Sequence, residues 1–173
     1  MERCLIGVGA NLDPEENIAE GLLLLARRVR ILAVSPFYVT APIGRPEQPD
    51  YLNGVVVVEH GDGPAALRDG ILRPVEAARG RARTADAYAA RTLDLDVLLY
   101  GDRTGHVAGM TLPDPHLWSA PFWPRPRWPC FPDWWSPARG GRSGNWPTPP
   151  LLRRAGGRTR LPNDSGRCLN DES

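Results

Sequence analysis

The sequence predicts an α+β fold of the ferredoxin-like type, with the element order βαββαβ. Two observations indicate this fold. Four apolar runs have the length and composition of strands, and two longer segments carry apolar residues at helical spacing. In such a fold the strands form one antiparallel sheet with both helices on one face, and we expect the second face to stay open for a ligand.

The first strand and the first helix are expected near the N-terminus. Residues 4–9 are apolar and end at Gly9, which predicts a strand followed by a turn. Asp13 is expected to cap a helix that has Pro14 in its first position and Glu16 three residues after the cap. Apolar residues at helical spacing continue this helix, and they are Ile18, Leu22, Leu25, Ala26 and Val29.

Two further strands and a second helix follow. Residues 31–40 are expected to form a strand with an edge or a bulge at Ser35-Pro36. Residues 51–60 are expected to form a strand that is buried on both faces. Residues 64–79 predict the second helix, in which Pro74 should produce a kink.

The last expected strand, residues 91–100, carries two carboxylates. Side chains alternate along a strand, so Asp94 and Asp96 should share the open face, with Cα atoms about 6.6 Å apart. Two like charges side by side are costly, and hard divalent cations are the usual compensation for oxygen ligands. The alternative is a solvated face that Arg91 neutralises. The helix side of the strand is expected to carry Leu93, Leu95, Val97 and Leu99.

Two neighbouring segments predict a substrate for such metals. Residues 40–50 contain three prolines, and Tyr51 and Asn53 follow on one face of a strand. An aromatic ring beside an amide suits a flat heteroaromatic ligand, although both side chains could instead serve only the loop and the turn. Guanidinium groups before the last strand suit a polyanion carried with Mg²⁺, with a solvated helix end as the alternative for Arg79. These arginines are Arg79, Arg81, Arg83 and Arg91.

Composition narrows the class of protein. A chain of 173 residues with a net charge of +1 predicts one domain, and it gives no global electrostatic basis for a nucleic-acid or membrane partner. No run approaches the 18 apolar residues of a membrane span. The three cysteines, Cys4, Cys130 and Cys168, are far apart and odd in number, which favours a reducing cytoplasm.

Five segments together form a more specific pattern, which covers roughly residues 3–117. They are Gly9–Leu12, Phe37–Thr40, Gln48–Asn53, Glu76 with Gly80–Arg83, and Arg91–Asp96. In this order and spacing they resemble the 6-hydroxymethyl-7,8-dihydropterin pyrophosphokinases of folate biosynthesis. The resemblance implies transfer of pyrophosphate from ATP to the hydroxymethyl group of the pterin, giving AMP, by a cytoplasmic enzyme that we expect to be a monomer.

The resemblance also implies roles for individual residues. Asp94 and Asp96 would hold two Mg²⁺ ions that bridge the ATP phosphates, and Arg81 and Arg91 would join them as catalytic residues. The pterin pocket would be lined by Gly9, Thr40, Pro42, Ile43, Tyr51, Asn53 and Phe122. The nucleotide side would be lined by Glu76, Arg81, Arg83, Tyr88, Arg91 and His116.

The C-terminal part departs from that family. Asp114 stands where the family has a histidine, with His116 close by, and Ala120 stands where it has an arginine; both family residues contact ATP phosphates. Residues 118–173 contain all six tryptophans and neither isoleucine nor valine, which is typical of a chain that cannot build a core. We therefore expect a pyrophosphokinase-like domain over residues 1–117 and a tail over residues 118–173 that does not fold by itself.

We interpret this tail as the product of a reading-frame shift near Phe122, because a GC-rich gene that is translated out of frame gives a sequence rich in Trp, Pro and Arg. This hypothesis predicts a poorly stable protein of low activity. One alternative is a tail that binds RNA through stacking and phosphate contacts. A second is an inactive remnant that at most binds pterin or nucleotide. A third, a palm-like nucleotidyl transferase on the same frame, is disfavoured by the Pro-rich loop and by Tyr51 with Asn53.

Overall fold

The computed structural model describes residues 1–42, 44–81, 89–119 and 153–154. The strands of its main sheet are β1 (Glu2–Ala10), β2 (Arg30–Val34), β3 (Tyr38–Thr40), β4 (Tyr51–His60), β5 (Asp94–Tyr100) and β8 (Arg153–Arg154), and a separate hairpin consists of β6 (Gly105–Val107) and β7 (Met110–Leu112). The helices are α1 (Pro14–Ala26), α2 (Pro64–Leu67), α3 (Arg73–Ala78) and α4 (His116–Ser119), with a π-helical turn η1 (Arg68–Leu72) between α2 and α3.

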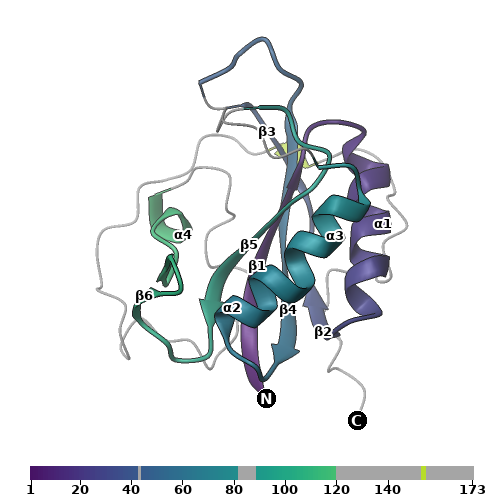
Figure 1. The fold of residues 1–173 in the computed structure, drawn as a ribbon. Helices are drawn as coiled ribbons and strands as arrows, with labels where there is room; N and C mark the ends of the chain where they lie inside the picture. The colour runs from purple at the N-terminus through teal and green to yellow at the C-terminus, as the bar shows by residue number, and fades with distance from the viewer. Residues whose placement is uncertain (43, 82–88, 120–152, 155–173) are drawn as a thin grey trace.

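The sheet has the topology that the sequence predicts. Its strand order is β5-β1-β4-β3-β8, and β2 also pairs with β4. All the pairings that the structure describes are antiparallel. Both β2 and β3 lie along the edge of β4 that is turned away from β1, one after the other. With α1 and the α2–η1–α3 segment on one face, this is the expected ferredoxin-like βαββαβ arrangement (Figure 1).

The main core lies between this sheet and the helices. Apolar side chains from every second position of β1, β4 and β5 meet one side of α1 and of the α2–η1–α3 segment. Strand β4 is buried over nearly its whole length, as predicted for a strand covered on both faces. The most buried members of this core include Ile6, Ile18, Leu22, Leu25, Leu67, Leu72, Leu93 and Tyr100.

The second face of the sheet is not open along its whole length, so that prediction is wrong. A second cluster of apolar side chains lies on it, and every member is less than a tenth exposed. These residues are Leu5, Leu32, Ala33, Val55, Val57, Leu98 and Leu99, with Leu117 packed against them. Polar residues lie at both ends of this face: Arg3, Arg30 and Glu59 at one end, and Asn53, Asp94 and Asp96 at the end where β4 and β5 begin. The predicted site residues lie at the second of these ends.

One predicted side-chain direction in β5 is also wrong. Leu99 was expected on the helix side, but it lies in the second cluster beside Leu98, whereas Tyr100 enters the main core. The pairing explains the change, because Leu5 is opposite Leu99 while Ile6 is opposite Val97. The extra residue forms a β-bulge, and a bulge reverses the alternation for everything that follows it. Both aspartates precede the bulge and keep their predicted face.

Three further details of the elements differ from the sequence-based expectation. The strand expected over residues 31–40 is divided into β2 and β3 around Ser35-Pro36, since proline cannot donate to a ladder. Asp13 precedes α1 as predicted, but it has a left-handed conformation (φ 39°) and its side chain makes no capping hydrogen bond. Helix α1 ends at Ala26, three residues before Val29.

The disturbance expected at Pro74 lies in the turn before it. The backbone N–H of Arg73 donates to the carbonyl of Arg68, five residues back, which is the wide hydrogen bond of a π turn. Pro74 has no N–H to donate to the preceding turn, and it lies in the first turn of α3, directly after η1. The helical segment therefore continues past the proline by widening one turn.

Gly21 should be required for packing α1 onto the sheet. A Cβ atom at this position would lie 2.5 Å from Leu93 Cδ2, in the main core. We expect Gly21→Ala to lower the free energy of unfolding by about 1–3 kcal/mol, measured by denaturant titration. Gly70→Ala is the matched control, because nothing lies within 4 Å of a Cβ there and the residue is exposed. It should be neutral or stabilising by up to about 1 kcal/mol.

The Cys4 thiol is expected to be unreactive in the folded protein. The residue is fully buried in β1, and burial, with a smaller contribution from Glu2, raises its pKa to about 12. Only about one thiol in 10⁴ is then a thiolate at pH 8, and the thiolate is the reactive form. Peptide mapping after iodoacetamide treatment should find Cys4 labelled only after denaturation. Labelling of Cys4 in the native protein at the rate of a free cysteine would contradict this expectation.

Candidate active site

The end of the second sheet face where β4 and β5 begin is organised by glycines in β1. Gly9 pairs with Asn53 of β4 on one side and with Asp94 of β5 on the other. Adjacent strands are about 4.8 Å apart, so Asn53 and Asp94 stand about 10 Å apart across a residue that has no side chain. Two residues earlier on β1, Gly7 lies between Val55 of β4 and Asp96 of β5 in the same way. The result is a floor without side chains between an amide and two carboxylates.

Asn53 occupies the space that Gly9 leaves. A Cβ atom on Gly9 would lie only 2.5 Å from Asn53 Oδ1, so the two residues fit together only because Gly9 lacks one. Asn53 Nδ2 donates to the Thr40 hydroxyl at 2.8 Å, and the residue is 6% exposed. Tyr51 and Pro42 are half-buried. Tyr51 lies two residues before Asn53 on β4, so the two side chains share one face of the strand. The structure thus brings together Gly9, Thr40, Tyr51 and Asn53.

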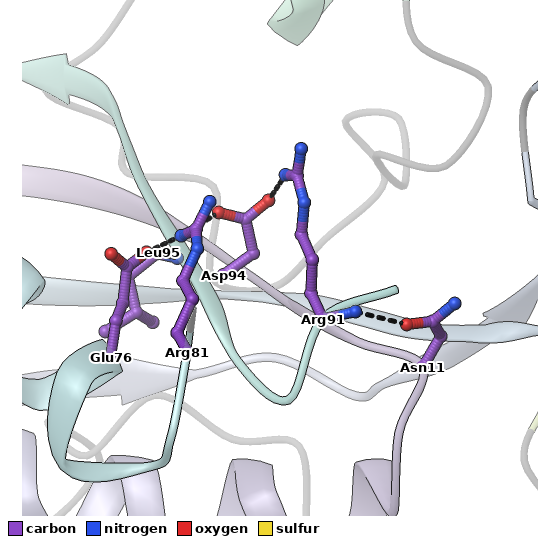
Figure 2. A network of polar contacts seen from close by, with 6 residues as sticks. All are labelled: Asn11, Glu76, Arg81, Arg91, Asp94 and Leu95. Atoms are coloured by element: carbon purple, nitrogen blue, oxygen red, sulfur yellow. Dashed lines mark hydrogen bonds and ion pairs between the residues drawn. The ribbon is translucent and has the colours of Figure 1, made fainter. Parts of the chain in front are cut away.

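Asp94 lies between two arginines (Figure 2). Its Oδ1 is 2.5 Å from Arg81 Nη1, and its Oδ2 forms an ion pair with Arg91 Nη1. The side chain of Asp94 is 13% exposed, so these pairs are only partly screened by water. Oδ1 is buried and makes no hydrogen bond within the described residues, although it has this ion-pair contact. Among the described residues, the ion pair with Arg81 is therefore what engages this buried oxygen of Asp94.

Asp96 differs from Asp94 in its surroundings. Its pKa is raised, first because protein atoms around the carboxyl reduce its hydration; Arg81 lowers it, and the Asp114 carboxylate raises it further. Arg91 and His116 have smaller lowering effects. The residue keeps solvent-exposed surface, so a cation or a phosphate can reach its oxygens. The pKa of Asp96 is accordingly affected by charged residues from the segment before β5 and from the segment after it.

The segment before α4 adds an acidic and a basic group near Asp96. The Asp114 backbone N–H donates to the Leu98 carbonyl at 2.9 Å, which attaches this segment to β5. Asp114 Oδ1 lies 3.1 Å from His116 Nδ1, and the His116 side chain is 72% exposed. His116 thus lies near the carboxylates with an accessible ring.

Asn11 is a central residue of the site to which the sequence assigned no role. Its Oδ1 accepts the backbone N–H of Arg91 at 2.7 Å, and its Nδ2 donates to Gln48 Oε1 at 3.0 Å and to the Pro49 carbonyl at 3.4 Å. Asn11 thereby connects the end of β1, the Pro-rich loop and the residue before β5 (Figure 2 shows the Arg91 contact). The signals available in the sequence were its place between a strand end and a helix start and its membership of the Gly9–Leu12 segment.

Arg79 is used by the fold. Its Nε and Nη2 donate to Asn17 Oδ1 at 3.2 and 2.9 Å, and Asn17 Nδ2 donates to the Leu12 carbonyl at 2.7 Å. These bonds fasten the end of α3 to the start of α1. Neither the phosphate interpretation nor the solvated-run alternative describes this residue, which binds another helix.

Several predicted site residues lie outside the described part of the chain. They are Ile43, Arg83, Tyr88 and Phe122, and the predicted tail also lies outside it apart from residues 118–119 and 153–154. Within the described ranges, no three or more His, Cys, Asp and Glu side chains are grouped to hold a metal ion by themselves. A cation at Asp94 and Asp96 would need further oxygen ligands, and nucleotide phosphates and water commonly supply these to Mg²⁺. None of the helices in these ranges combines the length and apolar character that crossing a bilayer requires.

Comparison with known proteins decides the family. The sequence pattern of the 7,8-dihydro-6-hydroxymethylpterin-pyrophosphokinase (HPPK) family matches residues 5–129, most of the chain. This chain belongs to the HPPK family. A Pseudomonas aeruginosa protein named 2-amino-4-hydroxy-6-hydroxymethyldihydropteridine pyrophosphokinase is 34% identical over 125 residues, which are 70% of this chain and 76% of that protein.

Other HPPK-family relatives give the same result. The protein of the same name from Synechocystis sp. is 34% identical over 139 residues, or 79% of this chain and 70% of its own. The one from Haemophilus influenzae is 35% identical over 116 residues, or 65% of this chain and 71% of its own. The HPPK pattern extends past Phe122 to residue 129, further than the motifs alone indicated. The family motifs that carried the resemblance all lie within the matched range.

Proposed function

We propose that this chain transfers the pyrophosphoryl group of ATP to the hydroxymethyl oxygen of 6-hydroxymethyl-7,8-dihydropterin, with AMP as the second product, in folate biosynthesis. The observation that carries the proposal is the row Asn53, Gly9 and Asp94, which sets an amide beside a carboxylate on a bare sheet floor. The names of the HPPK relatives support the same reaction for this chain.

The pterin would lie on the β4 side of that floor. The ring of Tyr51 offers a stacking surface, and Asn53 holds its amide in one orientation through its bond to Thr40. Because Gly9 has no side chain, a flat ring can approach the backbone of β1 closely. The remaining residues that we propose for this pocket are Pro42, Ile43 and Phe122.

The carboxylates would hold the metal ions that accompany ATP. Asp94 and Asp96 share a strand face and are hard oxygen ligands, and Asp94 Oδ1 is buried with an ion pair but no hydrogen bond in the described part of the chain; this donor set fits Mg²⁺. We propose two ions, which when bound would neutralise phosphate charge and align the acceptor. Asp94 can bind a cation only by loosening its contacts with Arg81 and Arg91, which would then be able to bind phosphate oxygens.

The reaction balances without further reactants. The pterin hydroxymethyl oxygen forms a bond to the β-phosphorus of ATP, the bond between that phosphorus and the oxygen bridging it to the α-phosphate breaks, and the hydroxyl proton is released. Negative charge develops on the departing AMP oxygen, and a guanidinium beside it lowers the energy of that state. We propose Arg81 and Arg91 for this role, because both flank Asp94. Glu76, Arg83, Tyr88 and His116 complete the proposed nucleotide side.

The test is formation of AMP from ATP and Mg²⁺ that depends on 6-hydroxymethyl-7,8-dihydropterin. We expect AMP and the pterin pyrophosphate in equal amounts, separated by chromatography. A purified, folded chain that forms no pterin-dependent AMP at saturating substrates would sink the proposal. Omission of Mg²⁺ should abolish the reaction, and its restoration should recover it.

A second candidate is a chain that binds pterin or nucleotide without catalysing the transfer. Asp114 favours it, because this carboxylate stands where the family resemblance predicts a histidine that contacts phosphate. It would be the correct description if calorimetry detects binding of pterin or of an ATP analogue while the AMP assay stays negative. A cytoplasmic monomer with a folded domain over residues 1–117 remains our prediction for the cellular form.

A further inference from the structure

Glu76 is a buried carboxylate beneath the candidate active site. It lies in the last turn of α3 and is 2% exposed. A carboxylate in such a position is costly unless charged or polar partners compensate it. The partners that compensate Glu76 therefore indicate what it does.

One partner is the backbone of the strand that carries the two aspartates. Leu95 N–H donates to Glu76 Oε1 at 2.8 Å. Strand β5 is at one end of the described sheet, so an outward N–H at Leu95 has no neighbouring strand to accept it. Glu76 takes the place of that strand, between Asp94 and Asp96.

The other partner is Arg81, which Glu76 holds at two points. Arg81 Nη1 forms an ion pair with the same Glu76 Oε1 (Figure 2), and the Arg81 backbone N–H donates to the Glu76 carbonyl at 3.1 Å. Gly80, with φ 74°, turns the chain between them so that both contacts can form. Arg81 is thus held both at its backbone and at its guanidinium group.

Arg81 is shared by Glu76 and Asp94. When a cation occupies Asp94, that carboxylate no longer holds the arginine firmly, whereas Glu76 lies deeper and is attached to Leu95. We propose that Glu76 is a positioning residue that keeps the Arg81 guanidinium on the phosphate side while Asp94 is engaged. This role rests on the proposed pyrophosphoryl transfer, and it refines the place of Glu76 on the nucleotide side, because Glu76 acts there through Arg81.

The test is a double-mutant cycle of Glu76→Gln and Arg81→Gln. The glutamine keeps an oxygen for Leu95 N–H and removes the charge that holds Arg81. Glu76→Gln alone should lower kcat about 10- to 100-fold, with KM for the pterin changed less than about twofold. In the Arg81→Gln background it should change kcat less than about twofold, because the group through which it acts is gone.

Binding and stability measurements complete the test. Calorimetry should show that Glu76→Gln weakens binding of a methylene-bridged ATP analogue with Mg²⁺ when Arg81 is present. The same substitution should have no such effect in the Arg81→Gln variant. Glu59→Gln is the matched control, since it removes the charge of another glutamate that pairs with an arginine, Arg30, at the far end of β4. Glu76→Met lacks an oxygen for Leu95 and should lower the melting temperature more than Glu76→Gln does.

Three different results would each overturn the positioning role of Glu76. Equal losses from Glu76→Gln in both backgrounds would mean that Glu76 acts independently of Arg81. Equal losses of activity and melting temperature in the Gln and Met variants would mean that Glu76 only supports the fold. A wild-type chain without pterin-dependent AMP would overturn the proposed function and this role with it, whereas an active chain with an additive cycle would overturn the role alone.

Discussion

Asp96→Asn is expected to reduce pterin-dependent AMP formation by about 10²- to 10³-fold while leaving the melting temperature within a few degrees of the parent. Asp96 keeps solvent-exposed surface and the surrounding protein raises its pKa, so removing its charge should not lower stability, whereas asparagine is a much poorer ligand for Mg²⁺. Initial rates at saturating ATP, pterin and Mg²⁺ give the first quantity, and a thermal melt followed by circular dichroism gives the second.

Two further variants make the Asp96 result interpretable. Asp102→Asn removes an exposed carboxylate from the turn after β5 and should change neither rate nor stability. Asp94→Asn should lose activity and also about 1–3 kcal/mol of stability, because Arg81 and Arg91 lose a charged partner. Retention of a tenth or more of the parent rate in Asp96→Asn would contradict its role as a metal ligand.

Gly9→Ala is expected to raise KM for the pterin about tenfold, with a smaller change in KM for ATP. The new Cβ would lie 2.5 Å from Asn53 Oδ1, so Asn53 must turn and give up its bond to Thr40. The pterin side of the floor is disturbed by this movement, and the Asp94 side is affected less. Steady-state kinetics with each substrate varied in turn measures the two effects separately.

Two further measurements, one in an Asn53→Ala background and one on Gly70→Ala, identify the cause of the Gly9 effect. If the clash with Asn53 is responsible, Gly9→Ala should add little to KM when Asn53 is already alanine. Gly70→Ala, in the exposed turn η1, is the control for adding a methyl group elsewhere. A pterin KM that Gly9→Ala leaves unchanged would show that the bare floor between β4 and β5 is not used by the pterin.

Much of the fold could be read from local patterns. The apolar runs over residues 51–60 and 91–100 predicted both strands, and alternation predicted the shared face of Asp94 and Asp96, because the period of a strand is a local property of the backbone. Ser35-Pro36 was recognised as an irregularity because proline lacks an N–H, but an edge or a bulge was predicted there and the structure has two separate strands. The bulge at Leu98 was not, since it depends on how β1 and β5 pair across the sheet.

The site was predicted in its residue types but not in its contacts. The sequence indicated Asp94, Arg81 and Arg91 as neighbours in one region, yet it could not show that the two arginines hold the same carboxylate. The role of Asn11 likewise needs three segments that are distant in the sequence, joined through one amide. Arg79 was grouped with the phosphate-binding arginines and in fact binds Asn17.

The sequence by itself determined the order of strands and helices, the family and the two carboxylates on one strand face, because periodicity and motif spacing are carried along the chain. Only the tertiary structure decided that Gly9 lies between Asn53 and Asp94, that Glu76 supports β5 and Arg81 together, and that most of the second sheet face is apolar and buried. The physical reason is that strand register and the partners of buried charges are set by contacts between segments far apart in the chain.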